Sequence, residues 1–115
     1  MQPAFDEKEL MDRLDNDIAF LAETVQMLET DGRKLMGDVQ TALAAGDAAA
    51  VGRSAHTLKG MISNFCAPAV QAMALEVEKA GKAGNFADAS AAAGRLAPGL
   101  EELIGQLDAF VKARS

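Results

Sequence analysis

The chain's one histidine lies in the segment Ser54–Phe65, which reads SAHTLKGMISNF. Apolar residues recur in and just before this segment at spacings of three and four, the rhythm of one face of an α-helix. At about 100° per residue, His56 falls about 140° from the centre of the apolar stripe, on the side that faces solvent. The pattern therefore predicts a helix over residues 48–65 that buries one face and exposes its histidine. The predicted stripe consists of Val51, Ala55, Leu58, Ile62 and Phe65.

The residues around the histidine favour phosphate chemistry. Gly52 and Gly60 lie one turn from His56 on either side, although glycine inside a helix costs about 1 kcal/mol relative to alanine. We interpret the two glycines as room for the close approach of another molecule. A neutral imidazole is a competent nucleophile near neutral pH, and Lys59, one turn along, can stabilise an anionic group beside it.

The run HTLKG at residues 56–60 resembles the H-x-L-K-G signature of histidine-containing phosphotransfer domains. These are small helical bundles that carry a phosphoryl group on histidine between receiver-domain aspartates in two-component phosphorelays. The resemblance extends over nearly the full length of the chain, through the layout of residues before and after the motif. It departs at Cys66, where the family usually has a glycine after the last hydrophobic residue of the motif.

The resemblance implies a phosphocarrier without kinase activity of its own. It implies that His56 accepts the phosphoryl group through Nε2 and that Lys59 offsets charge on the phosphoryl oxygens. The implied partners are response-regulator receiver domains, a hybrid histidine kinase, or both. Magnesium is expected on the receiver, and no metal or cofactor is expected on this chain. The expected receiver-docking face consists of Gly52, Arg53, Gly60 and Ser63.

Glu78 follows His56 by 22 positions. In the family, a residue at this spacing can hydrogen-bond the imidazole nitrogen that is not phosphorylated, which implies that Glu78 orients the ring. The alternative is an ordinary solvated glutamate on a charged face with Glu76, Lys79 and Lys82. The sequence leaves both readings open.

Composition limits the class of protein. The chain has 115 residues, is half hydrophobic, and has 4% aromatic residues and three prolines, a balance typical of one all-helical domain over residues 1–115. The net charge of −6 disfavours nucleic acid as a partner. A single cysteine excludes an internal disulfide, and no stretch has the roughly 20 apolar residues of a membrane span. We expect a soluble, cytoplasmic monomer that does not bind membranes.

The apolar pattern predicts an antiparallel up-down-up-down four-helix bundle with a short extra N-terminal helix. The short helix follows Asp6 as a cap. A long helix begins at Asp15 or Asn16 and runs to residue 45, with a weak or bent middle at Gly32. The histidine helix comes next, then a helix over 68–82, and then a helix from Asn85 to about residue 112 with a kink at its internal proline.

Two other functions remain open from the sequence. The first is an adaptor that docks a receiver or kinase partner by the same face and never carries phosphate. The second is a phosphotransfer domain cut from a longer hybrid kinase, which the initiator Met1 slightly disfavours. A metal site is disfavoured because one histidine and one cysteine cannot build the metal shells known in helical bundles.

Overall fold

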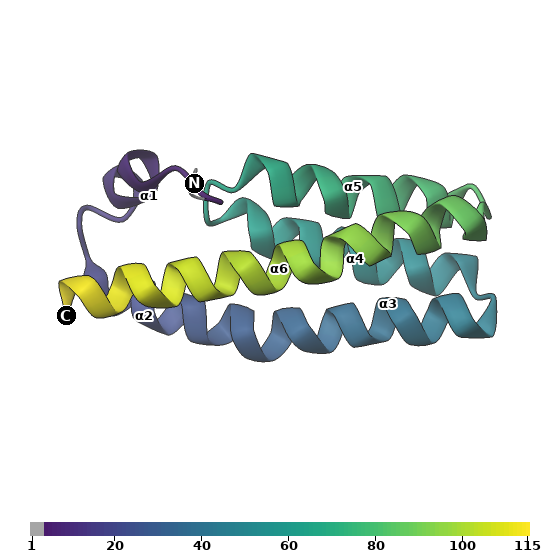
Figure 1. Ribbon diagram of the computed structural model, residues 1–115, viewed down its shortest axis with the longest axis horizontal. Coiled ribbons are helices and arrows are strands. Elements are labelled where there is room, and N and C mark those ends of the chain that lie inside the picture. The colour runs from purple at the N-terminus through teal and green to yellow at the C-terminus, as the bar shows by residue number, and fades with distance from the viewer. Residues whose placement is uncertain (1–3) are drawn as a thin grey trace.

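The protein is all-helical over residues 4–115, which the computed structural model describes. The long helices lie side by side along a molecule of 43 × 24 × 20 Å (Figure 1). Helix α4 packs against α3 and α5, and α6 packs against α5 and α2. None of the described helices is both long and apolar enough to cross a lipid bilayer. The elements are α1 (Glu7–Arg13), α2 (Ile18–Met27), η1 (Leu28–Gly32), α3 (Arg33–Ala45), α4 (Ala48–Ser63), α5 (Pro68–Lys82) and α6 (Phe86–Arg114).

Helices α2 and α3 form one continuous rod, because the segment η1 between them is a π-helical turn rather than a break. The predicted weak middle of this helix is therefore a widened turn. Gly32 is buried there, and a Cβ on it would lie 3.1 Å from Leu28 Cδ1. Glycine thus leaves room for the Leu28 side chain at the point where the apolar stripe lacks a large side chain.

The rod starts later than the sequence predicted. Asp15 and Asn16 both adopt positive φ, 51° and 61°, so they form a turn and cannot begin a helix. Asp17 caps α2 instead, and its carboxylate accepts a hydrogen bond from Phe20 N at 3.0 Å. At the other end, α3 stops at Ala45 as predicted, and Gly46 follows it with φ of 66°.

The histidine helix is two residues shorter than predicted, because α4 ends at Ser63 and a turn follows. Cys66 has φ of 54°, in the left-handed region that favours glycine. This is the position where the resembled family usually has glycine. Asp6 N donates a hydrogen bond of 2.8 Å to the Cys66 carbonyl, so the turn is tied to the segment before α1.

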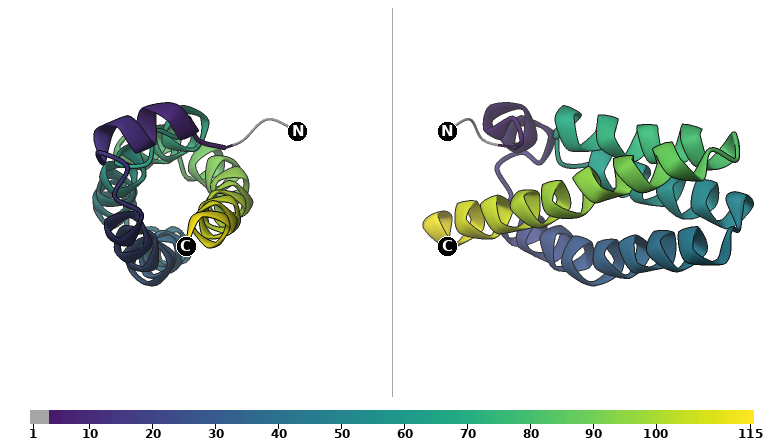
Figure 2. Two further views of the ribbon diagram at one scale, coloured as in Figure 1. Left: turned by 90° about the vertical axis from the view of Figure 1, so that its left-hand side faces the viewer. Right: turned by 45° about the vertical axis from the view of Figure 1, so that its right-hand side comes forward.

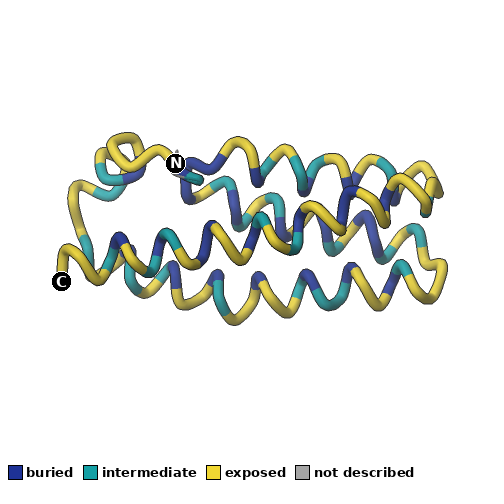
Figure 3. The backbone as a smooth tube through the Cα atoms, in the orientation of Figure 1, coloured by how far each residue is buried: buried dark blue, intermediate teal, exposed yellow. Residues whose placement is uncertain are grey.

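The core lies where the inward faces of the long helices meet, and buried positions recur along each of them (Figure 3). The predicted stripe of α4 is buried as expected, from Val51 to Ile62, and Phe65 remains buried although it lies beyond the helix end. This buried stripe therefore fixes which side of α4 stays in solvent. Helix α6, in turn, continues through Pro98 as a single helix.

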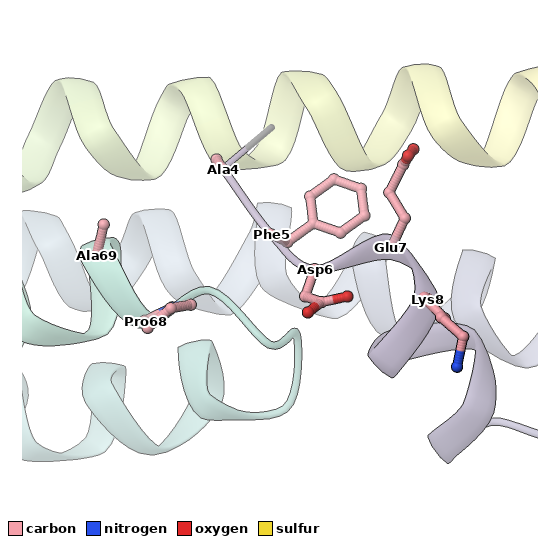
Figure 4. A pocket seen from close by; sticks show the side chains of 7 residues that line it. All are labelled: Ala4, Phe5, Asp6, Glu7, Lys8, Pro68 and Ala69. Atoms are coloured by element: carbon pink, nitrogen blue, oxygen red, sulfur yellow. The ribbon is translucent and has the colours of Figure 1, made fainter. Parts of the chain in front are cut away.

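Helix α1 lies across one end of the long helices (Figure 2). The segment before it places the Phe5 ring toward α6 (Figure 4), where it meets Phe110 edge to face at 5.4 Å between centroids. A surface hollow of about 570 Å³ lies beside this segment and the start of α5. The hollow is lined by Ala4, Phe5, Asp6, Glu7, Lys8, Pro68 and Ala69.

Candidate functional site

His56 projects from the solvent side of α4, and its side chain is 63% exposed. The helix is fixed at its start by Asp47, whose carboxylate accepts a hydrogen bond from Ala50 N at 3.1 Å. Burial of the stripe on the opposite side then sets the rotation of the helix. The imidazole consequently stands where a second macromolecule can reach it.

Glu78 on α5 is the buried polar residue next to this histidine, with only 5% of its surface exposed. Helices α4 and α5 approach closely one turn further along α5, where a Cβ on Gly81 would lie 2.5 Å from Val51 Cγ1. This close approach encloses the side chain of Glu78 between the two helices. Burying an ionised carboxylate is costly unless hydrogen-bond donors surround it.

Three donors surround the Glu78 carboxylate. Lys59 Nζ donates to Oε1 at 2.8 Å, and Lys82 Nζ donates to Oε2 at 2.7 Å. His56 Nδ1 lies 2.9 Å from the same Oε2. The hydrogen bonds from Lys59 and Lys82, together with the one from His56, outweigh the effect of burial and lower the pKa of Glu78 from 4.5 to about 2. The carboxylate is therefore ionised at neutral pH.

The ionised carboxylate fixes the tautomer of the imidazole. It carries no proton and can only accept hydrogen bonds, so the proton of the contact belongs to His56 Nδ1. A neutral ring protonated at Nδ1 keeps its free lone pair at Nε2. This arrangement is suited to nucleophilic attack by Nε2 on an electrophile approaching from solvent.

The structure brings together the three residues that the sequence reasoning placed in the chemical site. Glu78 lies against His56, and the alternative of a solvated glutamate is wrong because the side chain is enclosed. Lys59 also lies beside Glu78, but its side chain is only 23% exposed and its ammonium is bound to the Glu78 carboxylate. In this state, Lys59 therefore neutralises the carboxylate.

The four residues of the predicted docking face differ in exposure. Gly52 is buried, because the stem of Lys82 crosses it and a Cβ there would lie 2.8 Å from Lys82 Cγ. Its glycine makes room for the chain's own lysine rather than for a partner. Gly60 and Arg53 are exposed, and a Cβ on Gly60 would meet nothing within 4 Å. Ser63 is half-buried, and its Oγ donates to the Gly60 carbonyl at 2.6 Å.

Lys82 is the residue of the site that the sequence reasoning missed. By sequence it belongs only to the alternative of a solvated charged face, yet it binds the carboxylate that holds the histidine. Its spacing of four residues after Glu78 was the available signal, because residues at i and i+4 are neighbours on a helix surface. Within residues 4–115, no group of three or more His, Cys, Asp or Glu side chains could hold a metal ion.

Comparisons with known proteins give a family match and a structural neighbour. The family model of the Hpt domain matches residues 23–110, well over half of the chain. Among solved structures, the chain is similar to the histidine-containing phosphotransfer protein B (HptB) from Pseudomonas aeruginosa PAO1, with a TM-score of 0.81. The two share 21% sequence identity over 98% of each chain, a likeness that shows the fold. No curated protein sequence matches the chain.

Proposed function

The chain belongs to the Hpt domain family, the histidine phosphotransfer proteins of phosphorelays, and from this premise we propose that His56 carries the phosphoryl group. The observation that supports this assignment is the contact of 2.9 Å between His56 Nδ1 and the buried Glu78 carboxylate. In the neutral ring this contact leaves the free lone pair on Nε2, and the side chain is 63% exposed. His56 is also the one histidine of the sequence.

The proposed step is an in-line displacement at phosphorus. The lone pair of His56 Nε2 attacks the phosphorus of a receiver phosphoaspartate and forms a P–N bond. The P–O bond to the aspartate breaks at the same time, and its electron pair leaves with the carboxylate. No proton needs to be released, because the imidazole keeps its Nδ1 proton. Transfer to a second receiver is the reverse of this step.

Glu78 supports the charge that this step creates. The phosphorylated ring is a cation at the imidazole, and the Glu78 carboxylate already accepts its Nδ1–H group. A fixed negative group next to a developing positive charge stabilises the product without reorganisation. Lys59, bound to the other carboxylate oxygen, keeps Glu78 ionised and oriented.

The proposed partners are receiver domains and kinases of a phosphorelay, docking on the exposed side of α4. Gly60 and Arg53 belong to this surface, because both are exposed and Gly60 presents no side chain. Any magnesium in the reaction is proposed to lie on the receiver. On this view the protein is a monomeric phosphocarrier without kinase activity. Its single domain is an antiparallel up-down-up-down four-helix bundle with α1 as an extra helix.

The test is phosphate transfer from radiolabelled receiver domains to the wild type and to His56→Gln in parallel. We expect acid-labile, base-stable label on the wild type alone, with unchanged helicity and thermal stability in the variant. Label that persists on His56→Gln would refute the assignment. Docking without label on the wild type would favour a phosphate-independent adaptor instead.

A further inference from the structure

Lys82 and His56 share one oxygen of Glu78. Lys82 Nζ lies 2.7 Å from Oε2, and His56 Nδ1 lies 2.9 Å from the same atom. This one oxygen atom therefore links the two groups, through one hydrogen bond to each. Lys59 instead binds Oε1. Lys82, and not Lys59, therefore shares a carboxylate oxygen with the histidine.

The two lysines differ in their freedom to move. The side chain of Lys82 is 60% exposed, whereas that of Lys59 is 23% exposed. An exposed ammonium on a flexible stem can exchange one anionic partner for another at little cost. Lys82 can therefore leave Glu78 when a stronger anion arrives beside His56.

Gly52 directs Lys82 toward the histidine. A Cβ at residue 52 would lie 2.8 Å from Lys82 Cγ, 3.4 Å from Cε and 3.7 Å from Cδ. The aliphatic stem of Lys82 thus lies along α4 in the space that a side chain at residue 52 would fill. Gly52 is one turn before His56, so this path carries the ammonium to the phosphoryl-accepting ring.

We propose that Lys82 binds the phosphoryl group of His56: its ammonium moves from Glu78 Oε2 to the phosphoryl oxygens when His56 is phosphorylated. The inference rests on the proposed function. One carboxylate and two ammonium groups give the resting cluster a net charge of +1. A phosphoryl group brings a charge of roughly −2, and the Glu78 carboxylate alone would repel it. Transfer of Lys82 offsets that repulsion and leaves Oε2 entirely to the imidazolium Nδ1–H.

The first experiment compares Lys82→Met, Lys82→Arg and the control Lys79→Met. Lys79 is exposed on the same helix and is not one of the donors to Glu78. The two methionine variants change net charge equally. Transfer from a phosphorylated receiver is measured at saturating receiver concentration, so that the rate reports the chemical step rather than docking.

We expect Lys82→Met to slow transfer about tenfold, the effect of losing one hydrogen bond to a charged group. Lys82→Arg should keep the rate within about threefold, because it keeps the charge. Lys79→Met should stay within about twofold of the wild type. A phosphorus NMR titration of protein phosphorylated with phosphoramidate gives a second readout. Losing the cation in Lys82→Met should raise the phosphoryl pKa by about half a unit, because the dianion loses a stabilising charge.

The second experiment tests the role of Gly52. The variant Gly52→Ala should slow transfer as Lys82→Met does, because the new Cβ displaces the lysine stem. It should lower thermal stability no more than Lys82→Met does, since alanine is the better helix former. In a Lys82→Ala background, which lacks Cγ, Gly52→Ala should slow transfer no further.

Equal rates and equal phosphoryl pKa values in Lys82→Met and Lys79→Met would overturn the inference while leaving His56 as the acceptor. An arginine variant as slow as the methionine variant would also overturn it, because charge would then not be the cause. A wild type that takes no label from any receiver would refute the proposed function and this inference together.

Discussion

Replacing Glu78 with glutamine removes the negative charge at the centre of the site and keeps the size of the side chain. The amide oxygen of glutamine can still accept hydrogen bonds, but Lys59 then loses the anion that neutralises it. Glutamine also resembles the protonated form of glutamate. The variant therefore isolates the free energy that the ionised carboxylate contributes to folding.

The pKa of Glu78 gives the size of this contribution. The hydrogen bonds from Lys59, Lys82 and His56 lower that pKa from 4.5 to about 2. Because one pKa unit corresponds to about 1.4 kcal/mol, the shift amounts to about 3 kcal/mol at neutral pH. Water screens part of the interaction with Lys82 and His56, which are exposed, so we expect Glu78→Gln to lose about 2 to 3 kcal/mol.

The same shift fixes the sign of the pH dependence. A folded-state pKa below the unfolded one stabilises the protein fully above about pH 5, and this contribution is lost as the pH falls through about 2. The difference in unfolding free energy between the wild type and Glu78→Gln should therefore shrink from about 2 to 3 kcal/mol at pH 7 to about 1 kcal/mol at pH 3.

Urea denaturation followed by far-ultraviolet circular dichroism measures this difference, since the chain has no tryptophan or tyrosine to report by fluorescence. The control is Glu76→Gln, which breaks an ion pair of 3.0 Å with Arg95 in which both side chains are more than half exposed. Such a pair contributes about 1 kcal/mol or less. Equal losses of stability in the two variants, or a loss in Glu78→Gln that is undiminished at pH 3, would show that the ionised Glu78 carboxylate does not stabilise the fold.

Two further predictions concern glycines. Gly81→Ala places a Cβ 2.5 Å from Val51 Cγ1 and should lower stability by about 1 to 3 kcal/mol in urea denaturation. The control Gly94→Ala lies at an exposed position of α6 with nothing within 4 Å of the new Cβ, so it should raise stability by up to about 1 kcal/mol. Equal changes in stability for Gly81→Ala and Gly94→Ala would contradict the close packing of α4 on α5. Gly60→Glu should weaken receiver binding at least about tenfold in calorimetry, because it puts a charged side chain into the proposed interface. It should leave the fold intact, whereas Gly94→Glu should bind normally, and normal binding by Gly60→Glu would contradict docking over α4.

Local signals predicted the helices well. Asp6 caps α1 as predicted, and α4, α5 and α6 begin within one residue of the predicted starts, with Asp47 and Asn85 as the caps of α4 and α6. Each of these signals acts within one turn of a helix, so it does not depend on the rest of the fold. The predicted start at Asp15 or Asn16 was wrong because local signals alone did not distinguish between neighbouring candidate caps. Several acidic and amide residues near it can cap a helix, and backbone conformation selected Asp17.

The period of the apolar residues also predicted the exposed side of α4 and hence the position of His56. That prediction succeeds because burial of one stripe fixes the rotation of a helix about its own axis. The H-x-L-K-G resemblance added the chemistry, and the match to the Hpt family over residues 23–110 confirmed the family.

The contacts between α4 and α5 depend on tertiary structure. Whether Glu78 is buried, whether Gly52 faces a partner or a lysine, and where the Lys82 ammonium lies are set by the distance between the two helices. That distance is determined where Gly81 meets Val51, 30 positions apart in the chain. Periodicity describes each helix relative to its own axis and carries no information about how closely a neighbour approaches. The sequence therefore identified the histidine, and packing between two helices built the charged cluster that holds it.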